Sequence, residues 1–423
     1  MESRSGSHEL KGAGVSDASG VGTRAPNKSE HFRDDPHPIL AMAANEVSRG
    51  SAPAGPHFFA DLYSFNWSAF MFELPLVSAA AVAACLFTGV AVGHPAGGLI
   101  AGGGAFTVGF GPNQRIADSR LIPMIAAVIA TSVATLAGTV AGHRDYSLLV
   151  AAGICAVVYG VLTTRHSGLA WVGQQAGVAL LVASAFPTAA GPALTRAGLV
   201  AAGGLVQLVV TSAGLKLLPN LHRDVWTVAS SLLDAVRQED GTVRQLLHDI
   251  PLSIPALSTS EAAGYSLRLL ITILLATEVY RRLGIQSGYW IPMTALLVQK
   301  PAWAESLTRA AARVLGTLAG AWLGSLFIAH IAPRPVYLAA IAACFALLAY
   351  ATNAVNYALF TTALTGYIVF LLSLNQIPGI EIAHRRGWCT AIGAGIAVLI
   401  HADALLRLRL FLIPPREREE KIA

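Results

Sequence analysis

The sequence predicts an all-α membrane protein of about twelve transmembrane helices, arranged as two parallel six-helix repeats. Three observations predict this fold. Only 13% of the 423 residues are charged, whereas a soluble chain carries about 25%. Uncharged stretches such as 121–142 and 197–215 are long enough to cross a hydrocarbon core of ~30 Å. Finally, similar residues recur about 190 positions apart over a stretch of more than a hundred positions.

The segments outside the repeats are polar. Residues 1–56 mix both charge signs with Gly, Ser and Pro and lack an apolar run, which predicts a disordered cytoplasmic tail and no signal peptide. The first repeat is expected over 70–215 and the second over 264–410. Between them, 216–263 alternates charged and apolar residues and is expected to form cytoplasmic amphipathic helices. Residues 411–423 form a basic cytoplasmic tail.

Each repeat contains six expected spans. In the first they are 74–92, 97–110, 121–142, 146–164, 168–187 and 197–215. In the second they are 267–279, 288–299, 310–330, 336–352, 357–374 and 387–405. Most Lys and Arg then fall on the side of the two termini, which predicts cytoplasmic termini in a cell inner membrane. The adjacent Arg281 and Arg282 fall on the outer side, against this trend.

The repeat is indicated by matched residues with a nearly constant separation. The pairs are Gly98/Gly288, Arg120/Arg309, Tyr159/Tyr350, Pro187/Pro378, Arg196/Arg386 and Gly203/Gly393, separated by 189 to 191 positions. An even number of spans per copy gives both copies the same orientation, so the repeat is of the parallel kind.

The second span of each copy is short and interrupted by Gly or Pro. Gly102, Gly103 and Gly104 interrupt the first copy, and Gly288 and Pro292 interrupt the second. Short interrupted spans at matching places indicate a transporter's substrate site, because their free backbone groups need a protein or water partner. The alternative is that both segments only pack.

Arginines lie beside several spans. Arg120 and Arg309 open the third spans, and Arg313 follows one turn further in. A charge at the bilayer centre costs at least ~2.5–3.5 kcal/mol, so these residues are expected either to face a substrate pathway or to extend to the headgroups. Arg196 and Arg386, at the outer ends of the sixth spans, are expected to anchor at the interface; the alternative is a gate for anions.

Two acids are candidates for proton coupling. Glu278 ends the seventh span, but Arg281 and Arg282 follow at positions that favour an ion pair. Asp403 lies in the last span, with Arg407 four residues later, and the same alternative applies.

Uncharged polar residues within the spans have two interpretations as well. Tyr159 and Tyr350 are placed to stack on an aromatic substrate or to pack with their hydroxyls bonded. Gln174 and Gln175 are expected to face another helix or a pore, because lipid offers no hydrogen-bond partner.

No motif indicates an enzyme. The sequence has no GxxxxGK[ST] loop, G-x-S-x-G elbow or HExxH, and its four cysteines have no CxxC spacing. We therefore predict no catalytic activity, no cofactor and no metal site. The modest charge of +5 is explained by topology, so no nucleic-acid partner is expected.

The second copy carries a motif that resembles a known family. It consists of a Tyr-Trp pair at Tyr289 and Trp290, a Gln-Lys-Pro loop from Gln299, and then Arg309 and Arg313 before Gly316-Thr317. This pattern is similar to the fusaric-acid-resistance family, which includes bacterial aromatic carboxylic acid exporters and is distantly similar to plant aluminium-activated malate channels. The first copy lacks the Tyr-Trp pair.

The resemblance implies export of organic anions, aromatic or hydrophobic carboxylates above all, driven by the proton gradient. It also implies a periplasmic adaptor subunit, and a homo-oligomer is a further expectation. The alternatives are a passive anion channel and a non-transporting membrane anchor or assembly partner. The residues expected along the substrate pathway are Arg309, Arg313, Arg120, Tyr289, Trp290, Pro292, Gln299 and Tyr350.

Overall fold

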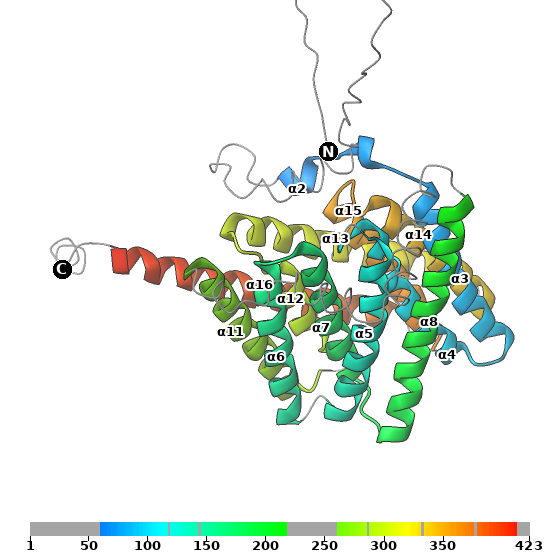
Figure 1. The fold of residues 1–423 in the computed structure, drawn as a ribbon, viewed down its shortest axis with the longest axis horizontal. Coiled ribbons are helices and arrows are strands. Elements are labelled where there is room, and N and C mark those ends of the chain that lie inside the picture. Colours follow the sequence, from blue (N-terminus) through cyan, green and yellow to red (C-terminus); the bar gives the residue numbers. More distant parts are fainter. Residues whose placement is uncertain are drawn as a thin grey trace, which may run out of the picture. The chain divides into compact units, whose positions relative to one another are not determined.

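The computed structural model describes residues 60–116, 119–142, 145–217, 260–285, 287–330, 334–375 and 379–412. Within these residues the secondary structure is helical, apart from an isolated bridge between Ile116 and Ser119 (Figure 1). The helices of the first half are α2 (Ala60–Tyr63), η1 (Trp67–Ala69), α3 (Glu73–Ala91), α4 (Pro95–Val108), η2 (Gly111–Asn113), α5 (Leu121–Ala141), α6 (Tyr146–Thr163), α7 (Ser167–Ser184) and α8 (Ala190–Leu217). Those of the second half are α11 (Ser260–Leu283), α12 (Trp290–Val298), α13 (Trp303–His330), α14 (Pro335–Thr352), α15 (Tyr357–Ser373) and α16 (Gly379–Leu412).

Each of the twelve expected spans coincides with a helix, α3 to α8 and α11 to α16. In the described part of the chain, seven of these helices are long and apolar enough to cross a membrane: α3, α5, α6, α8, α11, α13 and α14. Helix α15 is apolar but shorter. The all-helical membrane fold is therefore confirmed, whereas the number of crossings stays a prediction. The tails at 1–56 and 413–423 and nearly all of the expected linker lie outside the described residues.

Four helices begin about two turns before the expected starts: α8 at Ala190, α11 at Ser260, α13 at Trp303 and α16 at Gly379. Three of these earlier starts each place an arginine within the helix. Arg196, Arg309 and Arg386 therefore lie inside helices and not at their ends. The prediction was wrong because it took charge as a boundary, although arginine is a good helix former.

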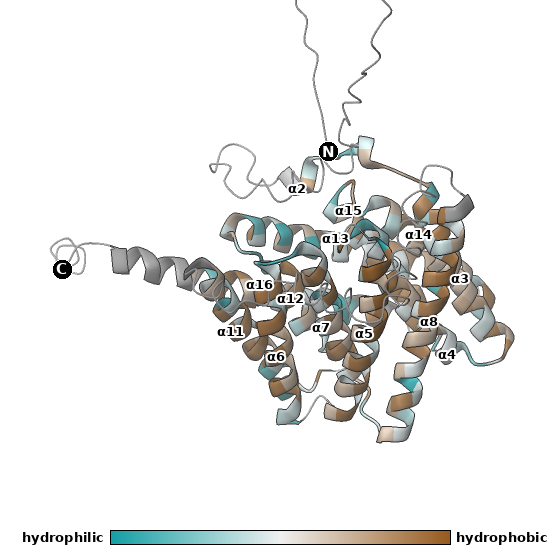
Figure 2. Cartoon of the chain, in the orientation of Figure 1, coloured by the Kyte–Doolittle hydropathy of each residue, from teal (hydrophilic) through white to brown (hydrophobic). Residues whose placement is uncertain are grey.

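The exposed and buried faces of α5 are the reverse of those of a soluble helix. Its exposed face carries Ile129 and Val133, which are 61% and 62% exposed. Its buried face carries threonines at i, i+4 and i+8, namely Thr131, Thr135 and Thr139. Apolar residues predominate along the neighbouring helices too (Figure 2). This distribution suits a helix whose outer face meets lipid.

Glycines bring α4 against α8, and α12 against α16, at very short distance. A Cβ atom on Gly203 of α8 would lie 1.8 Å from the carbonyl oxygen of Ala101 in α4. A Cβ atom on Gly393 of α16 would lie 2.2 Å from the carbonyl oxygen of Ile291 in α12. The sequence predicted that glycines interrupt this span, but helix α4 is continuous. Its glycines instead allow the backbones of neighbouring helices to touch.

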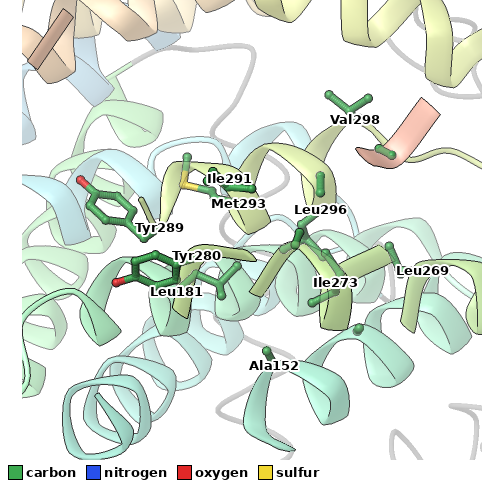
Figure 3. Packing of buried hydrophobic residues seen from close by; sticks show 14 of the residues in the cluster. Ala152, Leu181, Leu269, Ile273, Tyr280, Tyr289, Ile291, Met293, Leu296 and Val298 are labelled. Atoms are coloured by element: carbon green, nitrogen blue, oxygen red, sulfur yellow. The ribbon is translucent and has the colours of Figure 1, made fainter. Parts of the chain in front are cut away.

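The two largest apolar clusters of the described residues each draw on both halves of the sequence. One cluster joins α3 and α4 to α14 and α15. The other joins α6 and α7 to α11, α12 and α16 (Figure 3). Helix α3 packs on α14, and α6 packs on α11. The two halves of the sequence are thus interleaved, and do not form two bundles of their own.

Candidate functional site

The short helix α12 lies at the centre of the candidate site. It has nine residues, about 14 Å at ~1.5 Å per residue, and cannot cross a bilayer alone. Pro292 is tolerated because it lies in the first turn, where its missing N–H has no partner to lose. The helix ends at Val298, and its C-cap residue, Gln299, has an extended backbone. Almost all of α12 is buried, mainly against α11, α7 and α16.

Several polar groups of α12 are buried without a hydrogen-bond partner in the described part of the chain. Gln299 is fully buried, and neither its amide oxygen nor its amide nitrogen is bonded. The indole nitrogen of Trp290 is also unbonded. An unsatisfied buried polar group costs about 1–3 kcal/mol. A ligand or water that formed hydrogen bonds with these groups of α12 would remove that cost.

Helix α13 supplies two arginines that converge on one tyrosine. Arg309 and Arg313 are four residues apart and therefore share a helix face. The guanidinium carbon of Arg309 lies 4.0 Å from the ring centroid of Tyr357, and Nη1 of Arg313 donates to the Tyr357 hydroxyl at 3.1 Å. Arg313 is 2% exposed. Nε of each arginine has no hydrogen-bond partner among the described residues.

The position of Tyr357 is fixed by a helix cap. Tyr357 is the first residue of α15, and the side chain of Asn356 accepts hydrogen bonds from Ala358 and Leu359, at 2.9 and 3.1 Å. Asparagine is among the best residues for this cap. The cap therefore holds the ring against the arginines of α13.

A third arginine comes from α16. Arg386 is 1% exposed, and its guanidinium carbon lies 3.9 Å from the ring centroid of Trp290. Its Nε donates to Oγ1 of Thr365 at 3.2 Å, and its Nη1 is unbonded within the described residues. Arg386 and Arg313 are close enough to repel each other. The prediction that Arg386 anchors at the interface was wrong, because its side chain is buried against Trp290 of α12.

No described Asp or Glu pairs with Arg309, Arg313 or Arg386. The described salt bridges are those of Glu278 with Arg281 and Arg282, and of Glu381 with Arg385. Two of the three guanidinium groups instead rest on aromatic faces, which offset only part of the cost of burying a cation. The cluster is thus a concentration of buried positive charge that an anion would neutralise.

Aromatic rings continue from this cluster across the molecule. The ring of Tyr357 is 5.9 Å from that of Phe360, which is 5.7 Å from that of Phe110. Phe110 is 4.6 Å from Tyr350. Tyr350 donates to the carbonyl oxygen of Phe106 at 2.8 Å, so its hydroxyl is satisfied within the protein. Tyr350 therefore joins the arginine cluster through intervening rings, and not by direct contact.

Comparison with known families decides the assignment of this segment. Residues 273–400 match the family model described as fusaric acid resistance protein-like. This match supports the suspected resemblance over these residues. No curated protein and no solved structure matches the chain. The family match and the apolar helices indicate a membrane transporter or efflux protein. The matched family is one of membrane transporters.

The fusaric acid resistance protein-like segment contains most of the residues expected along the pathway. It brings Arg309 and Arg313 together at Tyr357, and Trp290 to Arg386. Tyr289 is buried beside Trp290, with the two ring centroids 4.8 Å apart. Arg120 lies outside the segment, half-buried at the N-cap of α5.

Tyr357 and Thr365 are the residues that the geometry adds to the site, and Arg386, whose alternative role was an anion gate, joins them. Asn356 before an apolar run marks a helix start and could have pointed to Tyr357. No local pattern indicates Thr365, or that Arg386 meets Trp290, because these contacts depend on the packing of α15 and α16 on α12 and α13.

The remaining expectations have mixed outcomes. Glu278 forms the ion pair that the sequence favoured, with Nε of Arg281 at 2.8 Å and also with Arg282. The side chain of Asp403 lies outside the described residues. Gln174 donates to the Tyr159 hydroxyl at 3.0 Å, so it faces helix α6, as expected.

Proposed function

We propose that the protein exports organic anions, and that Arg309, Arg313 and Arg386 form the site that neutralises their negative charge. The observation that carries this proposal is three arginines on α13 and α16 without an acid partner among the described residues. Each charge costs at least ~2.5–3.5 kcal/mol at mid-bilayer, and a carboxylate between them offsets that cost for both partners.

Aromatic or hydrophobic carboxylates are the proposed substrates. Support comes from the surfaces beside the charges, since Tyr357 and Trp290 each present a ring face to an arginine. The aromatic run from Tyr357 through Phe360 and Phe110 offers further ring surface next to the site. A substrate with a ring and a carboxylate matches both kinds of surface. Coupling to the proton gradient remains a prediction, and so do a periplasmic adaptor and a homo-oligomer.

We further propose that the architecture is a pair of parallel six-helix repeats with twelve spans. The helices of the two halves have matching neighbours: α4 packs on α3 and α8, and α12 on α11 and α16. The contact of Gly203 with Ala101 matches that of Gly393 with Ile291, 190 positions later. His166 caps α7 as Asn356 caps α15, again 190 positions later.

The function is tested by flux into vesicles. Purified full-length protein in proteoliposomes is expected to move radiolabelled benzoate but not benzyl alcohol, its uncharged analogue, because the arginines select for charge. An uncoupler should lower benzoate accumulation against its gradient. Benzoate flux that an uncoupler does not change supports the channel alternative. Absence of benzoate flux in vesicles with correctly folded protein contradicts transport of these acids.

The proposed orientation, with both termini cytoplasmic in the inner membrane, has its own test. We expect Ala302→Cys, before α13, to resist an impermeant thiol reagent added outside intact spheroplasts. Val336→Cys, at the start of α14, which follows the other end of α13, should react, since Val336 is 50% exposed. Both variants require a background without Cys85, Cys155, Cys344 and Cys389. Labelling of Ala302→Cys together with protection of Val336→Cys would contradict this orientation and place both termini outside.

A further inference from the structure

A surface groove lies where α6 packs on α11, away from the arginine cluster. It has a volume of about 480 Å³ and is lined by six residues of α6 between Leu149 and Val158, and by Leu270 and Leu274 of α11. Every lining residue is apolar or glycine. Val150 and Ile154 are 63% and 59% exposed, so the groove opens outward. Gly153 forms part of its floor: a Cβ atom added to this glycine would lie 3.4 Å from a methyl carbon of Leu270 and of Leu274.

A cluster of charge closes one end of this seam. Helices α6 and α11 run antiparallel, because Gly160 meets Ser266 while Tyr146 meets Arg281. The guanidinium carbon of Arg281 lies 4.1 Å from the Tyr146 ring centroid. Arg281 and Arg282 both pair with Glu278. The side chain of Arg282 is 78% exposed.

We propose that this groove binds one acyl chain of an anionic phospholipid, whose phosphate lies at Arg282. The length of the groove supports this occupant. From Leu149 to Val158 it runs about 14 Å at ~1.5 Å per residue, which is close to half of a ~30 Å hydrocarbon core and hence to one leaflet. The exposed arginine lies about one turn beyond the end of the groove, where a headgroup belongs.

The geometry disfavours two other occupants of the groove, a transmembrane helix of a partner and a second copy of this chain. A transmembrane helix would need an apolar surface about twice as long. A second copy of this chain, related by a two-fold axis along the membrane normal, would bring each Arg282 near the Arg282 of the other copy. The exposed Arg282 at this end attracts a phosphate and repels the Arg282 of a second copy. The site also accounts for the two adjacent arginines on the side that otherwise has few, an exception that transport does not explain.

Native mass spectrometry of the purified full-length protein tests this proposal. After incubation with phosphatidylglycerol or phosphatidylcholine of identical chains, the protein should retain one phosphatidylglycerol preferentially. Arg282→Gln leaves the pair of Glu278 with Arg281 and should reduce retention about five-fold, the factor that corresponds to ~1 kcal/mol per basic residue at a lipid surface. Ile154→Trp should fill the groove and reduce retention of both lipids.

Two matched controls separate this site from general effects of charge and bulk. Arg334→Gln removes an exposed arginine at the start of α14, and Val133→Trp adds a ring on the exposed face of α5. Both should retain phosphatidylglycerol as the unmodified protein does. The proposal fails if Arg282→Gln retains it equally well, or if Arg334→Gln loses as much. It also fails if the protein is a dimer that Ile154→Trp dissociates, since the groove then binds a second copy.

Discussion

Replacing Arg313 by glutamine is expected to lower benzoate flux in proteoliposomes roughly five- to 150-fold, the range that 1–3 kcal/mol of lost interaction gives. Arg313 is 2% exposed, its Nη1 is held by Tyr357, and its Nε is unbonded in the described part of the chain. In our proposal the free donor is available to a carboxylate. Lysine should restore flux only in part, because a point charge cannot offer the two-pronged contact of a guanidinium.

The thermal stability of the same variants distinguishes a site from a structural role. A buried cation without an acid partner is costly, so Arg313→Gln should leave the Tm unchanged or raise it while flux falls. Arg334→Gln, at an exposed position, should change neither quantity. If Arg313→Gln transports benzoate normally, Arg313 is not part of the pathway. If flux and Tm fall together, the residue holds the fold, and the site assignment is wrong.

The second large effect is expected on folding, from a single methyl group at Gly203. The Cβ atom of Gly203→Ala would lie 1.8 Å from the carbonyl oxygen of Ala101, so α4 and α8 must separate. We expect a loss of about 3 kcal/mol or more, the upper end for overpacking, seen as a lower Tm and less monodisperse protein in detergent. Backbone atoms, unlike the end of a flexible side chain, have no other rotamer in which to avoid the contact.

Gly198 provides the matched control on the same helix. A Cβ atom there meets nothing within 4 Å, so Gly198→Ala should keep or raise the stability, by up to about 1 kcal/mol from helix propensity. Gly393→Ala, which meets the carbonyl oxygen of Ile291 at 2.2 Å, should behave like Gly203→Ala. Equal Tm values for Gly203→Ala and Gly198→Ala contradict the close approach of the two backbones.

The sequence predicted the helices better than it predicted their ends or their contacts. Hydropathy located all twelve helices because each carries an apolar run, although those of α12 and α15 are short. The starts of α8, α13 and α16 were misplaced because the runs there follow a charged residue that is nevertheless helical. Of the site, spacing alone indicated that Arg309 and Arg313 share a face. The meeting of Arg386 with Trp290 depends on how α16 lies against α12, and local pattern contains no information about that contact.

The interleaving of the two halves sets a constraint on the order of synthesis. Helices α3 and α4 pack on α14 and α15, and the Tyr350 hydroxyl bonds a carbonyl oxygen 244 residues earlier in the chain. At ~5–20 residues per second, that separation takes roughly 12 to 50 s to translate. During this time α4 exists without the tyrosines of α14 and α15 that later bond its backbone. The first half of the protein therefore cannot complete its packing until the ribosome has synthesised most of the second half.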